Sequence, residues 1–267
     1  MELSQVANGI EIDPRKYTTL VYGEPGVGKT SWAAQIPGSY FVKTEEGHKG
    51  VSIFGSPCGD WDTFLDFCVE IQRGVAEGWE GRREITTIVI DVLDRLYDQL
   101  DVWLCKHKTF VVRGVGQNYE SIRHVPYGQG FVEANKELLR VLNKIVALGL
   151  GLVLICHEKT RTVKWRGEEL SKPEPDLVPS AIDAITGYCD AIGHFTVEEK
   201  VEKQGLEVIR TETGRWQWWQ PSFLRIAKHR LKGFPEKLPL AMDIGYKTYR
   251  KAFEEASGTK GGLRDGR

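Results

Sequence analysis

GEPGVGKTS, residues 23–31, follows the apolar run YTTLVY and precedes WAAQI, so it joins an expected strand to an expected helix. The stretch matches the pattern G-x-x-x-x-G-K-[ST] in full, with Gly23, Gly28, Lys29 and Thr30 at the fixed positions. Glycines allow successive backbone N–H groups to converge on a phosphate, and the helix N-terminus adds the positive end of its dipole. In this context the match indicates a nucleotide-binding loop rather than a chance glycine-rich turn.

This loop predicts which groups hold ATP and Mg²⁺. Lys29 is expected to reach the β- and γ-phosphates, and the Thr30 hydroxyl is expected to coordinate Mg²⁺. The residues expected to contact the nucleotide are Gly23, Glu24, Pro25, Gly26, Val27, Gly28, Lys29, Thr30 and Ser31.

The rest of the chain predicts the sheet that carries this loop. The runs at 17–22, 39–44, 86–91 and 151–156 are apolar on both alternating faces, as in buried parallel strands. Helical patterns at 29–35, 61–75 and 130–148 lie between them, which predicts an α/β fold with a mostly parallel sheet and helices on both faces. After Cys189, the runs at 190–199, 206–213 and 222–230 predict an antiparallel edge meander.

Composition limits the functions that remain open. The net charge of the 267 residues is −1, so any affinity for nucleic acid must come from local patches. The five cysteines are odd in number and form no CxxC pair, which argues against a disulfide framework or a zinc site. The N-terminus is too polar for a signal peptide, and no apolar run approaches the length of a membrane span. We therefore expect a cytoplasmic protein without membrane contact.

Polar residues at the ends of the other strands predict the remaining catalytic groups. Asp91 ends the strand TTIVID and is expected to hold Mg²⁺ through water, as a Walker-B aspartate does. Glu45 and Glu46 follow the second strand, and Glu45 is expected to be the general base for the attacking water. His157 follows GLVLIC and is expected to sense the γ-phosphate. The alternatives are a helix cap for Asp91, a solvated turn for the glutamates, and a capping or core-edge histidine.

The order of these parts resembles the RecA-type core of P-loop ATPases. The resemblance covers residues 17–232 and is carried by GEPGVGKT, FVKTEEG, IVID, LICH and AKHRLKG. Within that group the chain looks most like compact, core-only phage ATPases related to RecA and RadA, proposed to act in single-strand annealing and recombination. With the ATPase core at 17–232, residues 1–16 are an N-terminal extension. The pattern of residues 233–267 predicts a C-terminal helix followed by a polar, glycine-rich and flexible tail.

The same resemblance implies partners. Single-stranded DNA is the expected ligand, a ring or filament of identical subunits is the expected assembly, and a single-strand-binding protein is a candidate partner. Lys228 and Arg230 match a K-x-R motif that RadA-like and KaiC-like proteins carry on a late strand. The match implies that both cations reach the nucleotide site of a neighbouring subunit, where they would assist catalysis. The alternative is two solvated cations on an edge strand.

Two segments mix cations with aromatic residues, as a sequence-tolerant single-strand site requires. The first, residues 105–131, contains Lys106, Lys108, Arg113 and Arg123 with Phe110, Tyr119 and Tyr127. The second, expected to be a loop at 158–172, contains Lys159, Arg161, Lys164, Trp165 and Arg166. Solvated faces are the alternative for both. The three tryptophans of RWQWWQP, residues 215–221, favour a packed hairpin or a subunit interface over base stacking.

These observations favour a RecA-like ATPase that binds single-stranded DNA. A replicative helicase or helicase loader would share every ATPase residue. A KaiC-like, ATP-dependent interaction switch without a DNA role is a third reading, against which the basic and aromatic segment after His157 argues.

Overall fold

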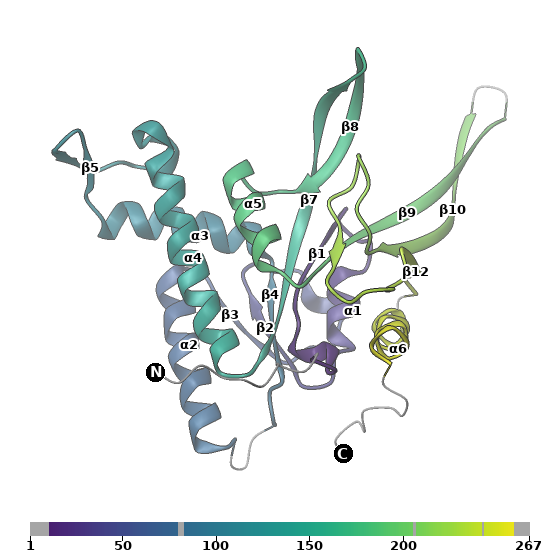
Figure 1. The fold of residues 1–267 in the computed structure, drawn as a ribbon, viewed down its shortest axis with the longest axis horizontal. Helices are drawn as coiled ribbons and strands as arrows, with labels where there is room; N and C mark the ends of the chain where they lie inside the picture. Colours follow the sequence, from purple (N-terminus) through teal and green to yellow (C-terminus); the bar gives the residue numbers. More distant parts are fainter. Residues whose placement is uncertain (1–10, 80–82, 205–206, 242, 259–267) are drawn as a thin grey trace.

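The computed structural model describes residues 11–79, 83–204, 207–241 and 243–258. Within these ranges one large sheet runs in the order β12, β10, β9, β1, β7, β4, β2, β3, with β11 paired to β9 and β8 paired to β7 (Figure 1). Its strands are β1 Thr18–Gly23, β2 Ser39–Lys43, β3 Gly55–Pro57, β4 Thr87–Asp91, β7 Gly151–Trp165, β8 Glu168–Pro175, β9 Ala191–Gln204, β10 Glu207–Trp218, β11 Lys228–His229 and β12 Lys237–Pro239.

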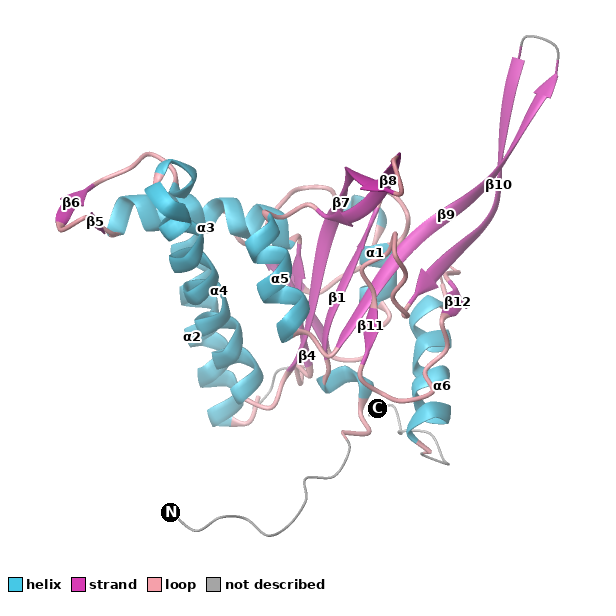
Figure 2. Cartoon of the chain, turned by 45° about the horizontal axis from the view of Figure 1, so that its top comes forward, coloured by secondary structure: helices cyan, strands magenta, loops and turns pink. Residues whose placement is uncertain are grey.

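Helices cover both faces of this sheet (Figure 2). Their bounds are α1 Lys29–Ala34, α2 Trp61–Glu77, α3 Leu93–His107, α4 Gln129–Ala147, α5 Pro179–Tyr188 and α6 Gly245–Ser257. Helices α2 to α5 pack on one face, and α1 and α6 pack on the other. None of the helices in the described ranges is long and apolar enough to cross a bilayer.

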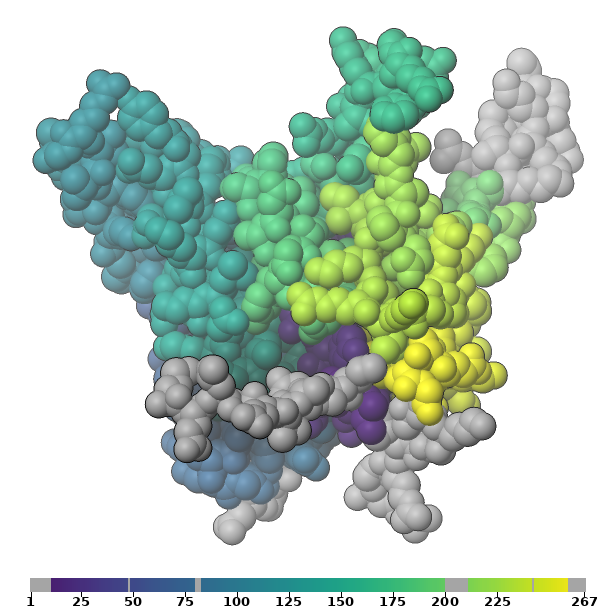
Figure 3. All heavy atoms as spheres, in the orientation of Figure 1, coloured from purple at the N-terminus to yellow at the C-terminus, as the bar shows by residue number. Residues whose placement is uncertain are grey.

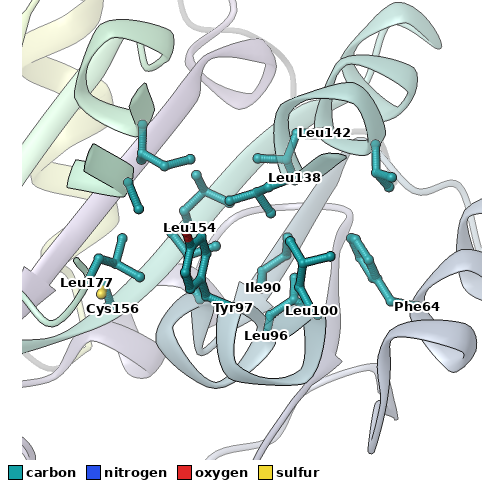
Figure 4. Packing of buried hydrophobic residues seen from close by; sticks show 14 of the residues in the cluster. Phe64, Ile90, Leu96, Tyr97, Leu100, Leu138, Leu142, Leu154, Cys156 and Leu177 are labelled. Carbon is teal, nitrogen blue, oxygen red and sulfur yellow. The ribbon is translucent and has the colours of Figure 1, made fainter. Parts of the chain in front are cut away.

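Alternation along the central strands builds the two cores. Leu154 and Cys156 of β7 point toward α3 and α4, where they pack near Tyr97 and Leu138 (Figure 4). Ile155, between them in sequence, belongs to the core beneath α1 and α6. Both faces of the strand are therefore apolar, as expected for a parallel strand covered by helices on both sides.

The predicted fold class is confirmed. Strands β1, β2, β4 and β7 and helices α1, α2 and α4 lie where the sequence placed them, and the central pairs are parallel. The expected C-terminal helix is present as α6. The predicted extension lies mostly outside the described residues, and so does the tail beyond residue 258.

The expectation of a loop at 158–172 is wrong. Strand β7 continues to Trp165, turns, and returns as β8 in an unbroken antiparallel register. The turn places Arg166 at φ 51° and Gly167 at φ 91°, and a two-residue hairpin turn favours positive φ at both positions. The segment is a β-hairpin, here called the β7–β8 arm, that extends beyond the sheet (Figure 1).

The third run of the predicted meander is only partly a strand. Strands β9 and β10 form a long antiparallel pair, but β11 contains only Lys228–His229. Just before it, a tight turn is closed by backbone hydrogen bonds between Ser222 and Arg225. Leu224 lies in that turn and is exposed.

Candidate active site

The loop at residues 23–31 connects β1 to α1 at the carboxyl end of the parallel strands. Gly26 and Gly28 have φ values of 77° and 113°, in the region where only glycine is free of strain. At Gly23, an added Cβ would lie 2.2 Å from the Phe195 carbonyl oxygen of β9. The glycines are therefore required by the backbone path and by the close approach of a neighbouring strand.

Lys29 is enclosed by this loop. Lys29 is buried, with only 6% of the residue exposed. Its Nζ donates to the carbonyl oxygens of Gly23 at 2.6 Å and Glu24 at 3.0 Å. Burial lowers the pKa of Lys29 below its ordinary value, although nearby acidic groups oppose the shift. The ammonium group is thus held inside the loop, where phosphates bound by the loop N–H groups would meet it.

Thr30 and Asp91 form the expected metal side of the site. The Thr30 hydroxyl donates to Asp91 Oδ2 at 2.8 Å, which joins the start of α1 to the end of β4. Hydroxyl and carboxylate oxygens are the hard ligands that Mg²⁺ prefers, usually with several waters retained. The two side chains therefore fit a Mg²⁺ ion at this position.

Glu45, rather than Glu46, faces the loop. Glu45 lines a cavity of about 270 Å³ together with Lys29, Asp91 and His157. Glu46 is exposed and is not among the described residues that line this cavity. Thr44 fixes the turn, because its hydroxyl accepts from the Val92 N–H at 2.7 Å and donates to the Val92 carbonyl at 2.8 Å. The end of β2 is thereby tied to the end of β4.

Asp94 is a site residue that the sequence reasoning missed. Its carboxylate accepts the His157 backbone N–H at 3.0 Å and lies 2.9 Å from His157 Nδ1. On the other side of the ring, His157 Nε2 lies 3.8 Å from Glu45 Oε1. The available signal was a second carboxylate three residues after Asp91, in VIDVLD.

This contact shifts both pKa values. The hydrogen bond to Asp94 raises the pKa of His157 above its ordinary value, against the opposing effect of burial. Burial pushes the pKa of Asp94 up, but the hydrogen bonds from His157 outweigh it and the pKa lies below its ordinary value. The pair therefore favours a charged imidazole beside a charged carboxylate.

Arg215 of β10 also supports the loop. Its guanidinium donates to the carbonyl oxygens of Gly26 at 2.7 Å and Val27 at 3.2 Å. Arg215 is almost two hundred residues away in sequence, and the chain gives no local signal for this contact. The antiparallel pair β9–β10 thus helps to hold the phosphate-binding loop in place.

Comparison with known families agrees with this site. A family model described as an AAA domain matches residues 15–231. The chain belongs to this AAA domain family. No curated protein matches the chain. Among solved structures it is similar to a KaiC-like protein from the hyperthermophilic archaeon Pyrococcus horikoshii, with 15% identity over 86% of this chain and 88% of that chain and a TM-score of 0.40.

Membership places this AAA domain among the P-loop ATPases, which bind nucleotides and usually Mg²⁺. The sequence-based prediction of a P-loop ATPase is confirmed at that level. Relations to phage annealing proteins, a DNA ligand and subunit assembly stay predictions.

The K-x-R residues of this AAA domain contact groups other than its own phosphate-binding loop. Lys228 pairs with Ile192 and so lies near the start of β9, whereas Gly23 pairs with Phe195 farther along that strand. Lys228 Nζ donates to the Thr186 carbonyl at 2.9 Å, and Arg230 NH1 lies 3.1 Å from Asp190 Oδ1.

The first basic segment of this AAA domain does not form one surface. Lys106 lies in the last turn of α3, and Lys108 is ion-paired with Glu133. Arg113 contacts Tyr127 at the short hairpin formed by β5 Phe110–Val112 and β6 Val115–Gln117. This hairpin lies at the left edge of Figures 1 and 2, apart from the β7–β8 arm. Phe110 is buried, so it is not available for base stacking.

The β7–β8 arm separates the cations of the second segment. Lys159 contacts the Leu177 carbonyl and Asp176 near the root of the arm. Together with Arg123 of the first segment and His157, it lines a polar cavity of about 240 Å³. Arg161 and Trp165 lie on the same face of β7, because side chains four positions apart in a strand point the same way. Lys164 lies on the opposite face, where its Nζ is 3.8 Å from Glu169 Oε1.

The tryptophans at 216, 218 and 219 are packed, as the favoured reading expected. Trp219 is fully buried among the aromatic residues beneath α6. Trp216 and Trp218 lie on the other face of β10, where Lys237 Nζ is 3.7 Å and 4.5 Å from their ring centroids. These contacts hold β12 and the β10 hairpin together.

Proposed function

We propose that this protein hydrolyses ATP and binds single-stranded DNA, and that it promotes annealing or recombination. The observation that carries the ATPase part is the meeting of Lys29, Asp91, Glu45 and His157 around one cavity. The DNA part is supported by the β7–β8 arm, whose strand begins inside the sheet, passes His157 and ends in a basic and aromatic hairpin.

The side chains have distinct roles in this proposal. The loop N–H groups and Lys29 bind the phosphates, while Thr30 and Asp91 would hold Mg²⁺. When bound, Mg²⁺ neutralises charge on the phosphate oxygens. Glu45 orients the attacking water and accepts its proton, because it is the carboxylate that faces the cavity.

Asp94 and His157 position the last part of the site. Asp94 fixes the ring of His157 through Nδ1, so that Nε2 faces Glu45 and the space above the loop. A histidine held in this way can respond to the γ-phosphate through a hydrogen bond. Since His157 is followed directly by the arm, such a response would act at the root of the proposed DNA site.

The test is ATP turnover and gel mobility with single-stranded and double-stranded DNA. We expect single strands to bind and to increase turnover, and duplex to do neither to the same extent. Displacement of a strand from a forked duplex would favour the helicase reading instead. Nucleotide hydrolysis without any response to DNA would favour the interaction switch and overturn the DNA part of the proposal.

We further propose that the active site is shared between subunits, with Lys228 and Arg230 acting in trans. Arginine fingers of this kind raise turnover on the order of 10³–10⁵-fold in other nucleotide hydrolases. Mixing Glu45→Gln protein with Arg230→Ala protein should restore activity, because some interfaces then pair an intact base with an intact finger. Full activity of Arg230→Ala alone, or an inactive mixture with proven co-assembly, would contradict this assignment.

A further inference from the structure

Two tight turns bring aromatic side chains together at the outer end of the β7–β8 arm. Trp165 ends β7, and Phe223 lies in the turn closed by Ser222 and Arg225. The ring centroids are 4.2 Å apart with an interplanar angle of 46°. In Figure 3 the yellow-green segment that contains this turn rises to meet the green arm. Contact between the two turns is therefore made through aromatic rings.

Both rings remain half-exposed in this contact. Trp165 is 46% exposed and Phe223 is 47% exposed, so their mutual packing covers only part of each. The segments that carry the two rings are held separately near the phosphate-binding loop, one beside the Ser222–Arg225 turn and the other at the root of the arm. The Ile226 N–H donates to the Tyr22 hydroxyl at 3.2 Å, and Glu158 is 2.7 Å from His194 Nε2. The two rings are thus held at the surface by two separate segments, the arm and the turn at Ser222–Arg225, and are not buried in the core.

The face of the arm that carries Trp165 also carries unpaired positive charge. Arg161 lies directly opposite Lys172 in the antiparallel register, and neither forms an ion pair with another residue that the structure describes. Like charges directly opposite each other destabilise a hairpin unless an anion compensates them. Glu168 is opposite Trp165, and Glu174, at the inner end of the face, is buried.

A third cation lies at the rings themselves. The Arg166 guanidinium carbon is 5.6 Å from the Trp165 ring centroid. Arg161 is four strand positions from Trp165, a separation of about 13 Å. Between them, the partly buried Val163 and Leu170 form an apolar strip. The face therefore combines cations, spaced along the strand, with aromatic surface at its end.

We propose that Trp165 and Phe223 form a platform on which a base of single-stranded DNA stacks, while Arg161 and Lys172 contact its phosphates. This inference rests on the proposed DNA-binding function and deepens it. Neither Phe223 nor Lys172 is among the DNA-binding residues expected from the sequence. Lys164 is among them, but it lies on the opposite face of the arm and is not part of this site. Phosphate contacts beside exposed aromatic rings are the combination that single-strand sites use.

The first experiment needs no variant. Fluorescence anisotropy compares the wild-type protein on a labelled oligothymidine and on an oligonucleotide of equal length made of abasic residues. Both strands carry the same phosphates, so only base stacking distinguishes them. We expect the abasic strand to bind more weakly by about 5- to 150-fold, the range that stacking of one base gives.

Variants then locate the platform. Trp165→Ala and Phe223→Ala should each weaken binding of oligothymidine within the same range of about 5- to 150-fold. Trp165→Phe and Phe223→Tyr keep a ring and should retain most of the affinity. Leu224→Ala, the exposed neighbour of Phe223, is the matched control and should change the affinity little. Thermal unfolding of each variant identifies any loss of fold.

The cations have their own matched control. Arg161→Ala should flatten the log–log dependence of affinity on salt by roughly 0.7. Lys164→Ala, on the opposite face, should flatten it much less. Equal effects of the two would overturn the assignment of the binding face.

The outcomes separate the two proposals. If the wild type binds oligothymidine but binds the abasic strand equally well, the platform is wrong and the DNA function stands. If neither strand binds, the proposed DNA function fails and the platform fails with it. Retained affinity in folded Trp165→Ala and Phe223→Ala proteins would also overturn the platform, because base discrimination would then arise elsewhere.

Discussion

Strand β7 has two halves with opposite surroundings. Residues 151–157 lie between β1 and β4 and are covered by helices on both faces, so nearly all of their side chains are buried. Residues 158–165 pair only with β8, and their side chains are mostly exposed. A single backbone thus passes from the core of the ATPase site to the outer surface of the molecule.

The difference teaches how one strand can serve two purposes. In the inner half, apolar residues are required on both faces, and a polar residue is tolerated only at the end of this half, at His157. In the outer half, backbone pairing alone maintains the strand, so side chains are free to be cationic or aromatic. Substitutions should therefore have large effects at enclosed positions and small effects at the exposed ones.

The largest expected effect is at the enclosed lysine. Lys29→Ala removes the cation held by the loop, so ATP turnover should fall on the order of 10³-fold or more. Lys136→Ala, an exposed lysine of α4, is the control and should leave turnover unchanged. Turnover of folded Lys29→Ala protein close to that of the wild type would remove the loop from the mechanism.

A stability measurement compares the two halves of β7 directly. Leu154 is fully buried, and Leu154→Ala should lower the free energy of unfolding by about 2–5 kcal/mol. Thr162 is exposed, and Thr162→Ala should change it by about 0.5 kcal/mol or less. Denaturant unfolding of both variants checks this. Comparable losses would mean that the arm belongs to the cooperative core.

The two adjacent glutamates give the next contrast. Glu45→Gln keeps the shape of the side chain but cannot accept a proton, so turnover should fall by roughly 10²-fold or more while ATP still binds. Glu46→Gln should have little effect, since Glu46 is exposed outside the cavity. Should Glu46→Gln be the inactive variant, the assignment of the base is shifted by one residue.

The smallest expected effect is a pH dependence at His157. Its pKa is raised above 6.5 by Asp94, so the contribution of the pair to folding is complete below that pH and is lost as pH rises through the raised pKa. The free energy of unfolding should therefore fall more steeply as pH rises above 6.5 in the wild type than in Asp94→Asn protein.

The titration of His229 does not interfere with this measurement. Burial lowers the pKa of His229 to about 4, so its contribution is lost as pH falls below 6.5 rather than as pH rises. Equal slopes for the wild type and Asp94→Asn protein in the higher range would show that the hydrogen bond to His157 is not maintained in solution.

The sequence by itself determined the loop, the central strands and the order of polar residues at their ends. These features depend on local rules: glycine positions for a tight backbone path, two-sided apolar strands for a covered sheet, and a polar residue where a buried strand stops. Lys29, Thr30, Asp91, Glu45 and His157 were therefore recognisable from their places along the chain, and the structure gathers them around one cavity.

Only the tertiary structure decided which distant groups meet. Arg215 contacts Gly26 and Phe223 contacts Trp165 because separate segments pass close to each other, and no short-range pattern records such a meeting. The arm could not be predicted from the sequence either, because its strand is maintained by pairing with β8 and not by an apolar pattern. Local preferences fix elements and their ends, whereas long-range packing fixes the neighbours of each exposed side chain.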